Sequence, residues 1–241
     1  AMGVGTFTRG QNGEPFPFFY GWKTAGIFQT AKQVTDYVND KGVMLQPNAK
    51  PGDVIFVDYN KDGVINEDDR TKLGKGMPDW TFGLNLGADW RGIDFSAFFY
   101  ASVGNDIFDV SRRTDYPYLN QPAYMMDRWC GPGTSNKIPR LTKDLDGSTS
   151  NNNWRSSDLY VNDGSFLRLK SIQLGYTLPS SITNLFYVKN LRVYVMAENL
   201  FTLTKYHGFD PEISSGGTSL GVDRGIYPQA RTWLMGASVT F

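Results

Sequence analysis

Apolar and polar residues alternate strictly along residues 80–103, which read WTFGLNLGADWRGIDFSAFFYASV. In the first arm, large apolar side chains and Ala88 share one face, while Thr, Gly, Asn and Asp share the other. A tight turn at Arg91 and Gly92 separates this arm from a second one that alternates in the same way. Period-two alternation on both sides of a short glycine turn predicts a β-hairpin. Its arms, about ten or eleven residues each, suit tilted membrane-spanning strands.

Three later segments carry the same pattern and are predicted to be strands. They are FLRLKSIQLGYTL from Phe166, LRVYVMAENLFTL from Leu191 and TWLMGASVTF from Thr232. In the first of these the apolar phase shifts between Leu169 and Ile172, and a β-bulge there would restore the facing. In the second, Asn199 interrupts the apolar face. The sequence therefore predicts an all-β protein with long antiparallel strands.

The alternation by itself is compatible with two environments for the apolar face. In a soluble sandwich this face would form the core, and in an outer-membrane barrel it would meet lipid while the polar face lines the lumen. The connectors alternate between short ones, such as Arg91-Gly92, and long ones, over residues 104–164 and 205–231. Short turns at one end and long loops at the other are typical of outer-membrane barrels. Trp90 and Trp233 at strand ends also suit interfacial girdles.

Composition narrows the class of protein further. The 241 residues carry 24 basic and 24 acidic side chains and no basic stripe, which argues against a nucleic-acid partner. Aromatic residues make up 15% and glycines number 26, which favours a β-rich chain with many turns. The single cysteine, Cys130, excludes an intrachain disulfide. No apolar run of about 18 residues is present, so no membrane-spanning helix is predicted.

Residues 58–69, DYNKDGVINEDD, have the spacing of an EF-type calcium loop. Such a loop places oxygen ligands at positions 1, 3, 5, 7, 9 and 12 and a glycine at position 6, which is Gly63 here. The predicted ligands are Asp58, Asn60, Asp62, the main-chain carbonyl of Val64, Asn66 and Asp69. Position 12 is Asp instead of Glu, and the preceding segment PGDVIFV is predicted to be extended, so this is a lone loop with a structural Ca²⁺. The alternative is a metal-free turn rich in Asn, Asp and Gly.

The long segment 104–164 offers a candidate binding surface. Flat aromatic faces beside amide and carboxylate groups suit sugar recognition. The candidate residues are Tyr116, Tyr118, Tyr124, Trp129 and Trp154. The alternative is that these aromatic side chains pack the loop upon itself or against a partner lipoprotein.

No catalytic constellation stands out. The only histidine, His207, has no Cys or His at metal-ligand spacing and is predicted to be a polar loop residue. Asp210 and Glu212 form a carboxylate pair of the kind that glycosidases use, but nothing in the sequence places them across a cleft. The chain is therefore not expected to be an enzyme.

Several blocks in order resemble one family. They are PFPFFYGWKTAGIFQT, KPGDVIFVDYNKDGVINEDDRTKLGKGMPDWTFGLNL, VNDGSFLRLKSIQLGYTLP, LRVYVMAENLFTLTKYHGFDPE and YPQARTWLMGASVTF. From about Gly13 to the last residue the sequence resembles SusC-like TonB-dependent outer-membrane transporters, the SusC/RagA family. The resemblance implies the C-terminal part of a large barrel of the 22-stranded class, with the plug domain absent from residues 1–241. It places the two long connectors and the calcium-like loop outside the cell.

The resemblance also implies a function and partners. Such a transporter would import oligosaccharides or peptides across the outer membrane of a Gram-negative bacterium, beneath a SusD-like surface lipoprotein. TonB would act through the missing plug, the remaining barrel strands would complete the wall, and outer-membrane lipid would surround it. Two alternatives of other classes remain: a soluble calcium-stabilised carbohydrate-binding β-domain and a secreted glycosidase.

Overall fold

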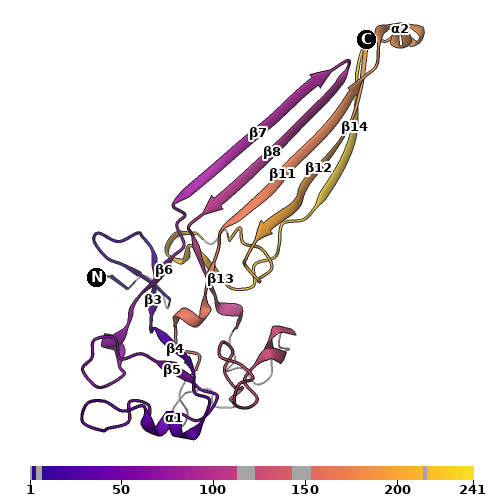
Figure 1. The fold of residues 1–241 in the computed structure, drawn as a ribbon. Coiled ribbons are helices and arrows are strands. Elements are labelled where there is room, and N and C mark those ends of the chain that lie inside the picture. Colours follow the sequence, from indigo (N-terminus) through magenta and orange to yellow (C-terminus); the bar gives the residue numbers. More distant parts are fainter. Residues whose placement is uncertain (1, 4–6, 113–122, 143–152, 214–215) are drawn as a thin grey trace. The chain divides into compact units, whose positions relative to one another are not determined.

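The computed structural model describes residues 2–3, 7–112, 123–142, 153–213 and 216–241. The chain forms two compact units, each assembled from segments that are far apart in the sequence (Figure 1). The first comprises residues 1–76, 107–162 and 215–224, and the second comprises residues 77–106, 163–214 and 225–241. The first unit is made of short strands and loops, whereas the second is built on one sheet of long strands.

The second unit contains a five-stranded antiparallel sheet in the order β14-β12-β11-β8-β7 (Figure 1). Its strands are β7 (Trp80–Trp90), β8 (Ile93–Val103), β11 (Phe166–Thr177), β12 (Asn190–Thr204) and β14 (Thr232–Thr240). They have 9 to 15 residues, long enough to cross a bilayer at a tilt. Within the described residues, β7 and β14 each pair on one side only, so the sheet is open at both edges.

The predicted hairpin and the predicted bulge are both confirmed. Trp80 pairs with Val103 and Trp90 with Ile93, and Arg91 takes a positive φ of 49° in the turn between them. On β11 the register shifts between Leu169 and Ser171 against both neighbouring strands. On the β12 side, the single residue Lys170 of β11 lies opposite Asn199 and Leu200 of β12, and Asn199 has a positive φ of 51°.

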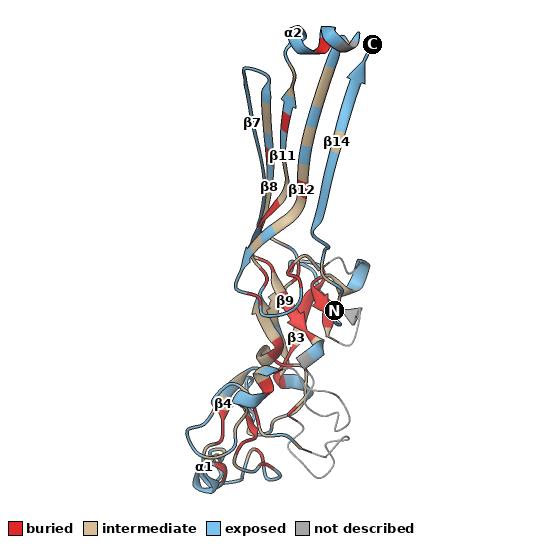
Figure 2. Ribbon diagram, turned by 90° about the vertical axis from the view of Figure 1, so that its right-hand side faces the viewer, coloured by how far each residue is buried: buried red, intermediate tan, exposed pale blue. Residues whose placement is uncertain are grey.

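The bulge keeps the apolar side chains of the sheet on a single face. Register places Leu84, Phe99, Leu169 and Phe201 in one cross-strand row, and Ile172 returns to this face beyond the bulge. Apolar side chains of this face are exposed on the two edge strands, among them Leu84, Leu86 and Met235, and these strands are almost entirely pale blue in Figure 2. An exposed apolar face of this extent is what a lipid-facing barrel wall requires.

The first unit holds three small sheets and their connections. The first sheet has the order β1-β2-β3-β6, the second pairs β4 with β5, and the third has the order β10-β9-β13. The strands are β1 (Met2–Gly3), β2 (Thr8–Gly10), β3 (Phe18–Gly21), β4 (Thr24–Ile27), β5 (Val54–Phe56), β6 (Thr71–Lys75), β9 (Asp106–Asp109), β10 (Val161–Asp163) and β13 (Val222–Asp223). The predicted extended segment before the calcium-like loop is β5.

The helices are short and lie in connections. The α-helices are α1 (Ala31–Asp36) and α2 (Ser180–Thr183), and the 3-10 helices are η1 (Glu67–Asp69), η2 (Val110–Arg112), η3 (Ala123–Asp127), η4 (Asp158–Tyr160), η5 (Asn184–Phe186) and η6 (Gly217–Ser219). No helix of the described residues is long and apolar enough to cross a membrane.

Three separate apolar clusters stabilise the first unit. The largest joins Phe19 of β3 to Phe108, Tyr160 and Val222, so that segments more than a hundred residues apart share one core. A second contains Trp22, Val54 and Phe56, and a third contains Phe28, Val34 and Ala49. The segment 104–164, predicted as one long loop, therefore supplies core residues to a folded unit.

A fully buried carboxylate, Asp53, ties three of these segments together. Its Oδ1 accepts hydrogen bonds from Arg140 Nε at 2.7 Å and from Asn153 Nδ2 at 2.9 Å. Its Oδ2 accepts from Arg140 Nη2 at 3.1 Å and from the Lys50 amide at 2.8 Å. Four donors compensate the cost of burying the charge.

Candidate functional site

The calcium-like loop begins directly after β5 and is shaped by its own acidic and amide side chains. Asp58 Oδ2 accepts the Gly63 amide at 2.8 Å, Asn60 Oδ1 accepts the Asp62 amide at 2.9 Å, and Asp62 Oδ1 accepts the Val64 amide at 2.9 Å. Gly63 has φ +87°, a left-handed conformation that favours glycine. Hydrogen bonds from the main-chain amide of Val64 and from the side chain of Asn60 hold the pKa of Asp62 below its usual value, because they stabilise the ionised carboxylate.

One carboxylate oxygen of Asp58 differs from the others in this loop. Asp58 Oδ1 is buried and, among the described residues, accepts no hydrogen bond. Burial, followed by the negative charge of Asp58, raises the pKa of the neighbouring Tyr37, whose hydroxyl donates to the Phe56 carbonyl at 2.8 Å. A buried carboxylate oxygen in a negative field is a position that a divalent cation would satisfy.

Asp69, the predicted ligand at position 12, accepts main-chain amides with both of its carboxylate oxygens. It is fully buried, its Oδ1 accepts the amides of Tyr59 and Asn60, and its Oδ2 accepts the Asn66 amide. These bonds close the loop upon itself. Within the described part of the chain, no three His, Cys, Asp or Glu side chains come together as a metal-binding group. A cation here would therefore depend on amide and main-chain oxygens in addition to carboxylates.

A buried ion-pair network lies in the second unit, where the sequence shows the carboxylate pair Asp210 and Glu212. Arg168 of β11 is buried and donates to Asp210 at 2.5 Å, to Glu212 at 2.6 Å and to Thr202 Oγ1 at 2.7 Å. Lys170, the bulge residue, donates to Glu212 at 2.7 Å. The two carboxylates are thus engaged in holding residues 205–213 to the sheet instead of flanking a cleft.

Asp210 is the centre of this network. Burial by itself raises the pKa of its carboxyl, but the amides of Gln229 and Glu212 together with Arg168 hold the pKa below its usual value. The amides of Glu212 and Gln229 donate to it at 2.9 Å each, so Asp210 joins both ends of the loop between β12 and β14. Its chemistry is that of a loop anchor.

The five aromatic candidates divide into three groups. Tyr116 and Tyr118 lie outside the described residues. Tyr124 is half-buried in η3, and Trp129 packs on Gly52 while its indole donates to Gln29 Oε1 at 3.2 Å, which is a structural contact. Trp154 lines a cavity of about 510 Å³ in the first unit. His207 and Cys130, which the sequence gives no chemical role, are both exposed.

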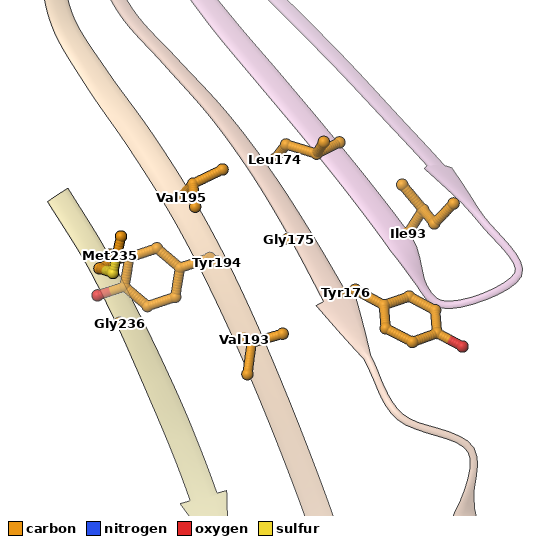
Figure 3. A pocket seen from close by; sticks show the side chains of 9 residues that line it. All are labelled: Ile93, Leu174, Gly175, Tyr176, Val193, Tyr194, Val195, Met235 and Gly236. Atoms are coloured by element: carbon orange, nitrogen blue, oxygen red, sulfur yellow. The ribbon is translucent and has the colours of Figure 1, made fainter. Parts of the chain in front are cut away.

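A larger hollow, about 600 Å³, lies on the sheet of the second unit. Figure 3 shows its lining side chains on β8, β11, β12 and β14. Ile93, Leu174, Val195 and Met235 lie on the apolar face of the sheet, and the ring of Tyr194 lies against Gly236. A hollow lined in this way lacks the polar groups that orient a hydrophilic ligand, and it belongs to the lipid-facing surface.

Known proteins are similar in sequence to this chain over most of its length. The chain is 31% identical over 239 residues to the TonB-dependent receptor P3 of Formosa agariphila, covering 96% of the chain and 23% of that protein. It is 30% identical over 200 residues to the TonB-dependent receptor SusC of Bacteroides thetaiotaomicron, covering 80% of the chain and 18% of that protein. The chain is a segment of a SusC-like TonB-dependent receptor. No family model matches it.

Solved structures give the same result for the fold of this SusC-like segment. The RagAB peptide importer in its open-open state matches with a TM-score of 0.71 and 25% identity, over 100% of this chain and 24% of that chain. The RagAB peptide transporter matches with a TM-score of 0.70 and 26% identity. The expected barrel fold is confirmed, and the soluble β-domain and the glycosidase are not supported.

The SusC-like segment spans about a quarter of the length of the relatives that it matches. Proteins of this family lie in the outer membrane of Gram-negative bacteria, and the exposed apolar face of the five-stranded sheet agrees with that location. The relatives are named as receptors and importers, in agreement with the absence of an evident catalytic constellation in the sequence.

Proposed function

We propose that this chain forms part of the barrel wall and the loops of a nutrient importer of the outer membrane. The five-stranded sheet carries the proposal: its strands are long enough to span a bilayer, one face is apolar and exposed, and the other is polar. TonB would supply energy through a plug domain, and further strands would close both sheet edges. The receptor would bind its substrate and gate its passage, and it would not alter the substrate chemically.

The proposed cargo is an oligosaccharide or a peptide, delivered with the help of a SusD-like surface lipoprotein. The likeness to SusC and to the RagAB peptide importer supports this class of cargo and a two-component arrangement.

Two matched substitutions in the full-length receptor test the assignment of the sheet faces. Leu84 lies on the apolar face of β7, and Asn85 follows on the polar face. Arginine at position 84 would meet lipid, at a cost of about 2–4 kcal/mol near the bilayer midplane, whereas arginine at position 85 would meet the aqueous lumen. We expect Leu84→Arg to reduce the folded receptor in outer membranes and Asn85→Arg to leave it unchanged.

Uptake by cells tests the import itself. A strain that lacks the receptor gene would be compared with the same strain carrying the full-length gene, using labelled oligosaccharide and peptide pools. TonB-dependent accumulation of either pool only in the complemented strain supports import and identifies the cargo. Equal accumulation of both pools in the two strains would refute the proposal.

We further propose a structural Ca²⁺ in the loop of residues 58–69. Asp58, Asn60, Asp62, Asn66 and Asp69, together with the Val64 carbonyl, would hold the ion. The buried and unsatisfied Asp58 Oδ1 supports this proposal. An ion in this position would stabilise the segment between β5 and β6 by binding only its folded form.

Limited proteolysis of residues 50–76 in the purified full-length receptor tests the calcium proposal. We expect a calcium chelator to accelerate cleavage in the wild-type protein, and Asp58→Ala to be cleaved quickly with or without Ca²⁺. The control is Asp68→Ala, which removes an exposed carboxylate of the same loop outside the proposed ligand set. Cleavage that is indifferent to the chelator would rule the ion out.

A further inference from the structure

The cavity beside Trp154 is lined by both aromatic and charged side chains. It measures about 510 Å³, within the ~300–1,000 Å³ typical of small-ligand sites. Its walls combine three aromatic side chains with two guanidinium groups and one carboxylate: Phe7, Trp22, Trp154, Arg70, Arg155 and Glu67. All of them belong to the first unit.

Backbone pairing between distant segments places these side chains around one space. The Trp22 amide donates to the Ser156 carbonyl at 2.9 Å, and Ser156 Oγ donates to the Tyr20 carbonyl at 3.1 Å. Gly21 permits this approach, because a Cβ there would overlap the Ser156 carbonyl. Arg155, which precedes Ser156, is thereby held against β3 and the residues after it.

The opposite wall comes from the calcium-like loop. The indole of Trp22 donates to the Asn66 carbonyl at 2.8 Å, which fixes residues 65–70 beside the ring. The Arg70 guanidinium lies over the rings of Trp22 and Tyr20, with its carbon 4.9 Å and 4.8 Å from their centroids. Arg70 Nη1 donates to Glu67 at 2.7 Å, so this arginine is partly neutralised.

Arg155 forms no ion pair with any carboxylate of the described residues. Its guanidinium carbon lies 5.4 Å from the Trp22 ring centroid and 5.1 Å from that of Phe56. Among the described residues it forms ring contacts but no hydrogen bond or ion pair. Arg70 Nε is likewise buried without an acceptor in the described part of the chain. Burial lowers the pKa of Arg155, and the charge of Glu67 offsets this only in part.

A second, smaller hollow continues the cavity on its apolar side. It measures about 90 Å³ and shares Phe7, Trp154 and Ser156 with the larger one. Phe108, Val110 and Tyr160 complete its apolar wall, and Asp109, whose Oδ1 accepts hydrogen bonds from Ser111, also lines it. A ligand would therefore meet an excess of guanidinium donors at one end and aromatic surface at the other.

We propose that this cavity binds a carboxylate group of the transported ligand, with the Arg155 guanidinium as its principal partner. The inference rests on the proposed import function and narrows its cargo to acidic molecules. A guanidinium presents a planar fork of donors that matches a carboxylate, and the flanking rings cover the apolar part of the same ligand. The carboxylate could come from a uronic acid of an oligosaccharide or from a peptide, and the two sources are separable by experiment.

Binding by the purified full-length receptor in detergent tests the proposal. The probes are a tri-uronate with its carboxyl-reduced counterpart, and a tripeptide acid with its C-terminal amide. The variants are Arg155→Gln and Arg155→Lys, and the control is Arg91→Gln, which removes the same charge from the hairpin turn of the second unit. Thermal unfolding of each variant shows whether it folds. Titration calorimetry gives the affinities.

We expect Arg155→Gln to weaken binding of at least one acidic probe by about tenfold to a hundredfold, the effect of one hydrogen bond to a charged group. The neutral counterparts and the Arg91→Gln protein should show no change, and Arg155→Lys should lose less. A loss confined to the tri-uronate identifies a saccharide source, and a loss confined to the tripeptide acid identifies a peptide source.

Equal affinity of the wild type for acidic and neutral probes would overturn the inference. So would unchanged affinity of the folded Arg155→Gln protein for both acidic probes. Uptake measurements separate this failure from failure of the import function: a receptor that imports cargo without dependence on Arg155 refutes only the carboxylate site. A receptor that imports nothing refutes the function, whatever the binding data show.

Discussion

Arg192 of β12 reaches across the whole width of β11 to pair with Asp94 of β8. Its Nε donates to Asp94 Oδ1 at 2.9 Å and its Nη2 to Asp94 Oδ2 at 2.5 Å. The pair crosses over Gly175, the residue of β11 that is in register with Asp94. This bidentate ion pair on the polar face thus spans three strands. It can form because residue 175 of the middle strand is glycine and has no side chain in the way.

Gly175→Ala should therefore destabilise the sheet. A Cβ at this position would overlap both Asp94 Oδ1 and Arg192 Nη2, so the ion pair must move apart, and its loss costs up to about 1 kcal/mol. The matched control is Gly87→Ala on β7, where a Cβ would find only the Phe95 carbonyl at 3.8 Å, an ordinary contact. Thermal unfolding of the full-length receptor in detergent should show a lower midpoint for Gly175→Ala alone. Equal midpoints would contradict the assigned geometry.

Arg168→Met should release the loop between β12 and β14 from the sheet. The substitution leaves Asp210 buried without its cation, and breaking one side of a buried pair costs about 3–5 kcal/mol. Lys170→Met is the control, because Lys170 is more exposed and Glu212 keeps Arg168 as a partner. Its cost should stay below about 1 kcal/mol. Hydrogen exchange of residues 205–213 measures the difference, and equal protection in the two variants would count against the anchor.

The anchoring of this loop should weaken in acid. Because the folded state holds the pKa of Asp210 below its usual value of about 3.9, its contribution is complete above that pH and is lost as the pH falls toward the lower folded-state pKa. Hydrogen exchange of the same residues, followed from pH 7 downward, should lose protection only below about pH 4. Asp210→Asn should remove this pH dependence. A wild-type transition near neutral pH would show that another group controls the loop.

Arg140→Met should destabilise the first unit, because it leaves the fully buried Asp53 with only its Asn153 and Lys50 donors. The expected cost is about 3–5 kcal/mol. The double substitution Asp53→Leu with Arg140→Met should recover part of this loss, since no charge is then buried. Proteolysis of residues 123–142 in the full-length receptor follows the effect. A double variant cleaved faster than Arg140→Met would contradict the role given to the charge.

The strands of the second unit are predictable from the sequence because their side chains obey one simple rule. Each strand has one face for lipid and one for a polar interior, so the period of two is visible along the chain. Even the bulge near Leu169 leaves a mark, as a shift in the apolar phase that the register confirms. The loop chemistry of Asp58 and Gly63 is visible for a similar reason, since its ligand spacing is local.

The fold of the first unit cannot be predicted from local sequence patterns. Phe19, Phe108, Tyr160 and Val222 share a core, although no periodic pattern connects them. Tyr160 lies in the short helix η4, and the strands of the other three residues have two to four residues, too few for an alternation to develop. Asp53 and Arg140 are 87 positions apart, and nothing in the sequence around either residue shows that the two form an ion pair.

By itself, the sequence determined the family, because five blocks of it occur in the expected order. It also determined the sheet strands with their two faces and the calcium-like loop, because each of these depends on neighbours within about a dozen residues. Only the tertiary structure decided that Asp210 and Glu212 anchor a loop, that Asp69 closes one, and that Arg155 meets Trp22 in a cavity. These roles depend on which side chains lie close in space. Contacts between distant segments are set by packing, and packing leaves no periodic trace in the chain.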